Sequence, residues 1–127
     1  NWCAAAVTSW IRRATHRVGD VSPVAGSGGA KALMAQFQKA KVWITAAEAR
    51  ANPSKVTAGM IPVWDRSVLG KPETGWHGHT CVTSGPVVGN LFPTVEGNSG
   101  LMGDRVSGDM ERRLDDLRLL GFGWFDV

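Results

Sequence analysis

The pattern of apolar residues changes near Gly59, and this change constrains the fold more than any other feature of the sequence. Before it, apolar residues recur at helical spacing. After it, they alternate in short runs, rich in β-branched residues and separated by Gly and Pro. Helices followed by a strand meander predict an α+β domain with an antiparallel sheet. A length of 127 residues suits one domain, residues 1–127. The first residue is Asn1 rather than Met, so we expect the domain to belong to a longer or processed chain.

Three helices are predicted in the first half of the chain. Residues 3–18 place apolar side chains along one stripe and basic side chains on the other side of a helix. Residues 30–41 are good helix formers. The run Thr45-Ala-Ala-Glu48 matches a capping box, in which Thr and Glu satisfy each other's backbone amides at a helix start. This short helix must end before Asn52-Pro53, because a residue that precedes proline avoids the helical conformation.

The second half predicts strands and one final helix. The final helix is expected over residues 109–120, where Met110, Leu114 and Leu117 share one helical face and Gly121 marks the end. The expected strand segments are 60–64, 79–83, 87–88 and 92–96.

Charge is unevenly distributed along the chain. The whole sequence has a net charge of +3, but residues 1–60 carry eight basic and two acidic groups. This excess predicts either a positive face for an anionic polymer such as the bacterial wall or simply a solvated helix face. It is small and lacks a recognition motif, so we do not expect nucleic-acid binding. No apolar run approaches the roughly 20 residues of a membrane-spanning helix.

Cys3 and His79 are the residues best suited to covalent chemistry. Cys3 lies at a predicted helix start, where unpaired amides and the helix dipole stabilise a thiolate. His79 begins a predicted strand after Gly78. Glu96 and Asn98 have the same strand parity and could both lie beside His79 if the two strands pair. Taken singly, Cys3 fits a buried structural cysteine, Glu96 a surface carboxylate and Asn98 a turn residue. The ordered set instead suggests a nucleophile, a base and an orienting group.

Three motifs carry a family resemblance. They are Trp2-Cys-Ala-Ala-Ala-Val-Thr-Ser-Trp10, Gly78-His-Thr-Cys-Val-Thr83 and Phe92-Pro-Thr-Val-Glu-Gly-Asn-Ser99. Together they resemble the CHAP family, the cysteine, histidine-dependent amidohydrolases/peptidases, which are compact papain-like enzymes that cut bacterial peptidoglycan. The resemblance spans essentially the whole chain. It implies a papain-like domain with N-terminal helices, an antiparallel sheet and, in this chain, the C-terminal helix.

The resemblance also implies roles for individual residues. Cys3 would be the nucleophile, His79 the base, Glu96 the group that orients the imidazole, and Asn98 a fourth polar member of the site. The enzyme would cleave an amide bond through a thioester, as an endopeptidase or an amidase, with no metal or organic cofactor. Its partner would be peptidoglycan outside the cytoplasm, reached by a secreted or virion-associated, endolysin-like protein or assembly.

Several residues near His79 have more than one interpretation. His77 has the same strand parity and is a rival base or a substrate-binding residue. Trp76 could line the substrate groove or pack in the core. Cys81 stands where the family usually has glycine, and its parity directs it to the face of His79. It is therefore either an inert buried thiol or the partner of Cys3 in an inhibitory disulfide. The spacing of His77, His79 and Cys81 does not match a metal site.

Two other functions remain open at this point. The domain could be a non-catalytic structural or wall-binding component of a larger assembly such as a phage tail. A transferase that forms amide bonds would use the same residues as the hydrolase.

Overall fold

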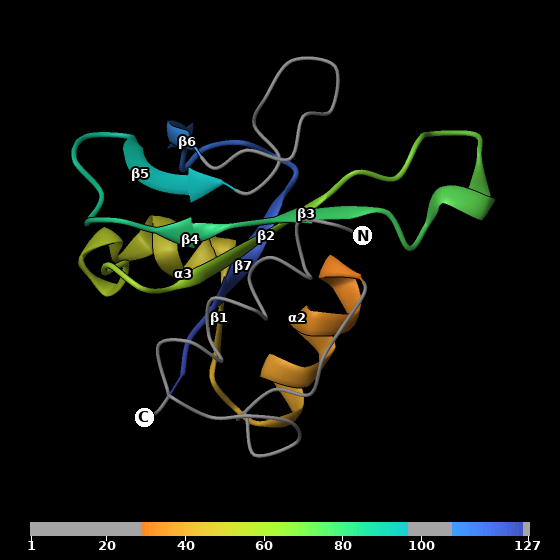
Figure 1. Ribbon diagram of the computed structural model, residues 1–127, viewed down its shortest axis with the longest axis horizontal. Coiled ribbons are helices and arrows are strands. Elements are labelled where there is room, and N and C mark those ends of the chain that lie inside the picture. Colours follow the sequence, from red (N-terminus) through yellow and green to blue (C-terminus); the bar gives the residue numbers. More distant parts are fainter. Residues whose placement is uncertain (1–28, 97–107, 126–127) are drawn as a thin grey trace.

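The computed structural model describes residues 29–96 and 108–125, and in these ranges the chain combines helices with antiparallel sheets (Figure 1). The helix expected over residues 3–18 lies outside the described residues. The described elements, in chain order, are α2 (Ala30–Lys39), β1 (Trp43–Thr45), α3 (Ala46–Ala51), η2 (Pro53–Lys55), β2 (Ile61–Asp65), η3 (Pro72–Thr74), β3 (Gly78–Thr80), β4 (Val82–Thr83), β5 (Leu91–Glu96), β6 (Gly108–Arg113) and β7 (Leu119–Gly123).

The two helices expected in the first half of the chain within the described ranges are both present. Helix α2 buries Leu33 and Phe37, one helical turn apart on the same side. The capping box forms in full at the start of α3. The Thr45 hydroxyl accepts the backbone N–H of Glu48 at 3.1 Å, and the Glu48 carboxylate accepts the Thr45 N–H at 3.4 Å. Helix α3 ends at Ala51, before Asn52-Pro53, as predicted.

The strands form two antiparallel sheets. The first has the order β1-β7-β2-β3 and the second the order β4-β5-β6. The predictions at 60–64 and 92–96 are confirmed by β2 and β5. The segment predicted over 79–83 divides at Cys81 into β3 and β4, so one extended stretch of chain passes from the first sheet into the second (Figure 1). Val88 makes an isolated bridge to Leu91 and belongs to no named strand.

The predicted C-terminal helix over residues 109–120 is wrong. The segment forms most of β6, a turn and the start of β7. Strand β6 pairs with β5 along its whole length, and β7 lies between β1 and β2. A helix here would leave backbone groups of β5, and of β2 at Trp64, without these partners. Leu117, counted toward the helical face, is 92% exposed in the turn.

Both faces of the first sheet are packed against other elements. Helix α2 contacts β2, β3, β1 and β7, and its Leu33 and Phe37 pack with Ile61 of β2. On the other side, Trp64 of β2 stacks against Phe92 of β5, at 6.1 Å between ring centroids. Since Ile61 and Trp64 are three residues apart along a strand, they point to opposite faces. The face that carries Trp64 is therefore the one turned toward the second sheet.

None of the helices in the described residues is long and apolar enough to cross a membrane.

Candidate active site

His79 is held between the two sheets by the pairing of β3 with β2. It lies directly opposite Trp64 in the register, and its ring lies 5.4 Å from the Trp64 ring. The side chain is buried. The preceding Gly78 permits this position, because a Cβ there would lie 2.9 Å from the Trp64 carbonyl oxygen and 3.1 Å from the Ala30 side chain. Glycine therefore lets β3 approach both β2 and the start of α2.

Glu96 reaches His79 from the second sheet. It is the last residue of β5 and only 1% exposed. Strand β4 follows β3 directly and pairs with β5, with Val82 opposite Val95. Glu96 Oε1 consequently lies 2.7 Å from His79 Nε2. The expectation that the two side chains lie together is confirmed, although β4, and not the strand of His79 itself, makes the pairing. Asn98 lies outside the described residues.

Arg112 of β6 completes the cluster. Its Nε donates to Glu96 Oε2 at 2.6 Å, and its Nη2 donates to Glu96 Oε1. The Thr94 hydroxyl also donates to Oε2, at 2.8 Å. The guanidinium carbon lies 5.3 Å from the centroid of the Trp64 ring, within the range of a cation–π contact. Glu96 thus has a partner on each side of its carboxylate.

Sequence reasoning missed Arg112 because it placed the residue in a helix. The same stretch also fits the two-residue period of a strand, because Met110, Arg112 and Leu114 occupy every second position and would share one face. In the structure Arg112 pairs with Phe92 across β5 and β6, while Met110 pairs with Thr94. Strand periodicity therefore places Arg112 on the buried face of the second sheet.

These contacts define the charge of the site. Burial alone would raise the pKa of Glu96, but hydrogen bonds from His79, Arg112 and Thr94 outweigh it and hold that pKa well below its usual range. The same pairing raises the pKa of Arg112 above its usual value, against the effect of burial. Glu96 is therefore a carboxylate at neutral pH and can only accept hydrogen bonds.

The ionised carboxylate determines the tautomer of His79. Only an N–H on Nε2 can bridge the 2.7 Å to Glu96 Oε1. Arg112 Nη2 lies 3.3 Å from the same Nε2. Both nitrogens carry hydrogens, so Arg112 does not accept the proton of Nε2, and Glu96 is its acceptor. In the neutral ring the lone pair is then on Nδ1. A base whose second nitrogen is fixed by a carboxylate is the arrangement that nucleophilic catalysis requires.

Cys81 lies in the same cluster. It is fully buried, and one donor atom each from His79, Cys81 and Glu96 lie within 4.8 Å of one another. The parity argument that placed Cys81 on the face of His79 is thus confirmed. Nitrogen, sulfur and oxygen ligands of this kind suit Zn²⁺. However, Arg112 occupies both oxygens of Glu96 and places a positive charge beside His79 Nε2. This arrangement favours an ion-pair cluster over a cation site.

Trp76 and His77 lie in the loop before β3. Trp76 is 61% exposed and meets the His77 ring edge-on, at 4.2 Å between centroids. The His77 backbone N–H donates to Thr74, and its carbonyl accepts from Arg66. These contacts belong to the loop and do not bring His77 into the cluster around Glu96. The role of either residue toward substrate stays a prediction.

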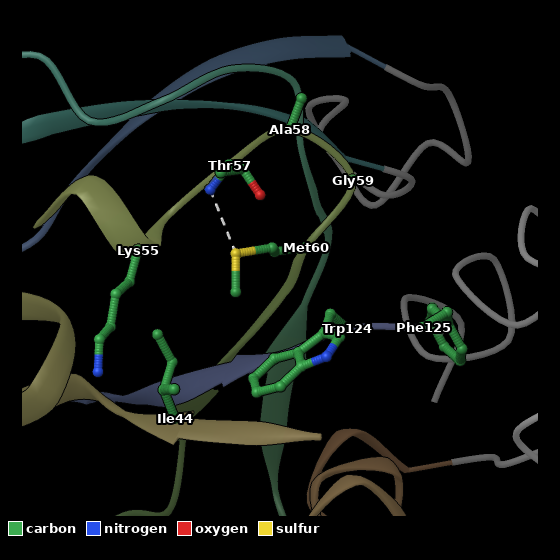
Figure 2. Close-up of a pocket in the computed structure, with 8 residues that line it drawn as sticks. All are labelled: Ile44, Lys55, Thr57, Ala58, Gly59, Met60, Trp124 and Phe125. Carbon is green, nitrogen blue, oxygen red and sulfur yellow. Dashed lines mark hydrogen bonds between the residues drawn. The ribbon is translucent and has the colours of Figure 1, made fainter. Parts of the chain in front are cut away.

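A separate pocket of about 530 Å³ lies at the start of β2. Trp64, which faces His79, is near the other end of this strand. Figure 2 shows Met60, Ile44 and the Trp124 ring around it, with the Lys55 ammonium to one side. The Thr57 N–H points to the Met60 sulfur at 3.2 Å. Lys55 is the only charged residue among the described lining residues. The pocket therefore offers apolar surface, while the groups suited to proton transfer are those around His79.

Comparisons with protein-family models, with curated proteins and with solved structures found no match for this chain. Cys3 lies outside the described residues, so the nucleophile and its disulfide with Cys81 stay predictions.

Proposed function

We propose that this protein is a papain-like peptidoglycan hydrolase that cleaves an amide bond through Cys3, His79 and Glu96. Cys3 would be the nucleophile and His79 the base that takes its proton. Glu96 would fix the imidazole, with Asn98 as a fourth polar member of the site. The observation that carries the proposal is the buried contact of 2.7 Å between His79 Nε2 and Glu96 Oε1.

The direction of this contact supports a catalytic role. Glu96 engages Nε2, so Nδ1 is the nitrogen that would face the thiol. An imidazole held by a carboxylate keeps one tautomer and one orientation, and the carboxylate also stabilises the imidazolium that forms during the reaction. Four donated hydrogen bonds, from His79, Thr94 and twice from Arg112, hold this carboxylate ionised and in place beside the ring.

The proposed reaction has two stages. In the first, His79 takes the proton of the Cys3 thiol, the sulfur forms a bond to the amide carbon, and the resulting oxyanion accepts hydrogen bonds from backbone amides at the helix start. The carbon–nitrogen bond then breaks as His79 gives its proton to the leaving amine. In the second, His79 takes a proton from water, the water oxygen bonds to the thioester carbon, and the carbon–sulfur bond breaks. The proton returns to the thiolate.

The choice of peptidoglycan as substrate rests on the three CHAP-like motifs. The basic excess of residues 1–60 is consistent with an anionic wall polymer.

The test is digestion of purified peptidoglycan from several wall types, followed by mass spectrometry of the soluble fragments. Wild type and Cys3→Ala would be compared under reducing conditions, with Cys81→Ser as the matched cysteine control. We expect new fragments from wild type and Cys81→Ser but none from Cys3→Ala, and their masses would identify the bond. An absence of fragments from every wall type would contradict the proposal.

One observation favours a second candidate, a non-catalytic wall-binding component. Val68, Leu69 and Trp76 are exposed on the segment that projects between β2 and β3 (Figure 1). Hydrogen bonds stabilise this segment. The Thr74 hydroxyl accepts the Val68 N–H and donates to the Lys71 carbonyl, and Lys31 donates to the Gly75 carbonyl. Exposed apolar side chains that gather on one segment are candidates for an interaction surface. If this candidate holds, the domain would cosediment with peptidoglycan without releasing fragments, and Leu69→Ser would weaken the cosedimentation.

A further inference from the structure

Arg112 lies where it can affect the protonation of His79 as well as the position of Glu96. Its guanidinium contacts both carboxylate oxygens and also lies 3.3 Å from His79 Nε2. The described groups with charge or titratable protons that face His79 are Glu96 from β5, Arg112 from β6 and Cys81 from the link between β3 and β4.

A buried histidine beside an unshielded carboxylate would be held as an imidazolium, because the opposite charge favours the protonated ring. A permanently protonated ring could not accept a proton from a thiol. In this site the carboxylate is shared with a fixed positive charge, which opposes a second positive charge on the neighbouring ring.

We propose that Arg112 is a positioning residue that neutralises Glu96 and so keeps His79 a neutral base with its proton on Nε2. Its significance for catalysis rests on the proposed function, whereas its effect on His79 follows from the geometry alone. Nε and Nη2 of Arg112 bond to different oxygens of Glu96 and fix the plane of the carboxylate, so that Oε1 stays directed at the ring. The Trp64 face behind the guanidinium, at 5.3 Å, holds the fork in place.

The charge and the shape of Arg112 can be separated by substitution. Arg112→Gln keeps a hydrogen-bond donor but removes the positive charge. Arg112→Lys keeps the charge but loses the two-pronged geometry. The matched control is Arg113→Gln, since Arg113 is on the same strand but pairs with the exposed Asp115 instead.

The experiment is a pH titration of the His79 ring by NMR in protein with isotope-labelled histidine, which needs no substrate. In Arg112→Gln we expect the midpoint to rise by at least about one pH unit, a roughly tenfold change in the protonation equilibrium. Arg112→Lys should stay close to wild type, and Arg113→Gln should not shift. In Cys3→Ala near pH 7, where no Cys3 thiol can give its proton to the ring, the ring nitrogen signals should show the neutral tautomer with its proton on Nε2.

Three results would overturn the proposal. One is a midpoint in Arg112→Gln that matches wild type. Another is a shift in Arg112→Lys as large as in Arg112→Gln, since charge would then not be the cause. The third is a doubly protonated His79 near pH 7 in Cys3→Ala, where no Cys3 thiol can give its proton to the ring; this can be read even if an Arg112 variant fails to fold. None of these depends on hydrolysis, so a failed peptidoglycan digestion would count against the proposed function alone.

Discussion

Substituting Glu96 with glutamine tests the charge cluster with little change in shape. Glu96→Gln keeps the size of a side chain that is only 1% exposed, but removes the negative charge that three donor side chains share. Arg112 would then lie beside His79 with no carboxylate to neutralise it. Removing one partner of a buried ion pair costs about 3 to 5 kcal/mol of unfolding free energy. We expect about 3 kcal/mol, the low end, because the Arg112 side chain is 27% exposed.

The loss should depend on pH in a definite direction. The pKa of Glu96 is depressed in the folded protein from its ordinary value of 4.5. A depressed carboxyl pKa contributes stability that is fully present above the unfolded value and is lost as pH falls below it. The variant lacks this contribution. The difference between wild type and Glu96→Gln should therefore be constant near neutral pH and shrink by roughly 1.4 kcal/mol for each pH unit below 4.5.

Urea denaturation followed by tryptophan fluorescence measures this difference, with both proteins compared near pH 7 and at about pH 3.5. A gap of the same size at both pH values would refute the reasoning, since it would mean that Glu96 is not ionised in the folded state. So would a gap below about 0.5 kcal/mol near pH 7, the range of an ordinary surface substitution.

Three further substitutions test the fold by the same denaturation assay. Gly121→Ala would drive its Cβ into the Ile44 carbonyl oxygen across the sheet, so a loss of more than about 2 kcal/mol is expected, and a loss below about 0.5 kcal/mol would contradict the close approach of β7 to β1. Thr45→Ala removes the N-cap of α3 and should cost about 1 kcal/mol, and no change would contradict the capping box. Leu69→Ser should change stability by less than about 0.5 kcal/mol because Leu69 is fully exposed, and a larger loss would show that this loop packs in solution.

Local signals predicted local structure well. The capping box of α3 was readable because all its hydrogen bonds lie within four residues, Thr45 to Glu48. The contact of His79 with Glu96 was anticipated on the condition that the two predicted strands pair, and the register of β4 against β5, with Val82 opposite Val95, brings the two side chains together.

What escaped prediction depends on long-range pairing. The sequence around Met110 and Leu114 fits a helical period and a strand period equally. The strand forms because β6 pairs with β5 along its length. The switch of sheets at Cys81 is likewise set by the partners on either side, β2 for β3 and β5 for β4. Because Arg112 was assigned to the wrong element, its approach to Glu96 could not be foreseen.

If His79 activates the Cys3 thiol, the rate of Cys3 alkylation near neutral pH will depend on His79. Mass spectrometry after timed exposure to an alkylating reagent reports Cys3 and the buried Cys81 separately. We predict that Cys3 reacts faster than free cysteine, that His79→Gln slows it at least about tenfold, and that Cys81 is protected in the folded protein. A Cys3 that reacts no faster than free cysteine, and at the same rate with and without His79, would contradict the role of His79 as the base that activates Cys3.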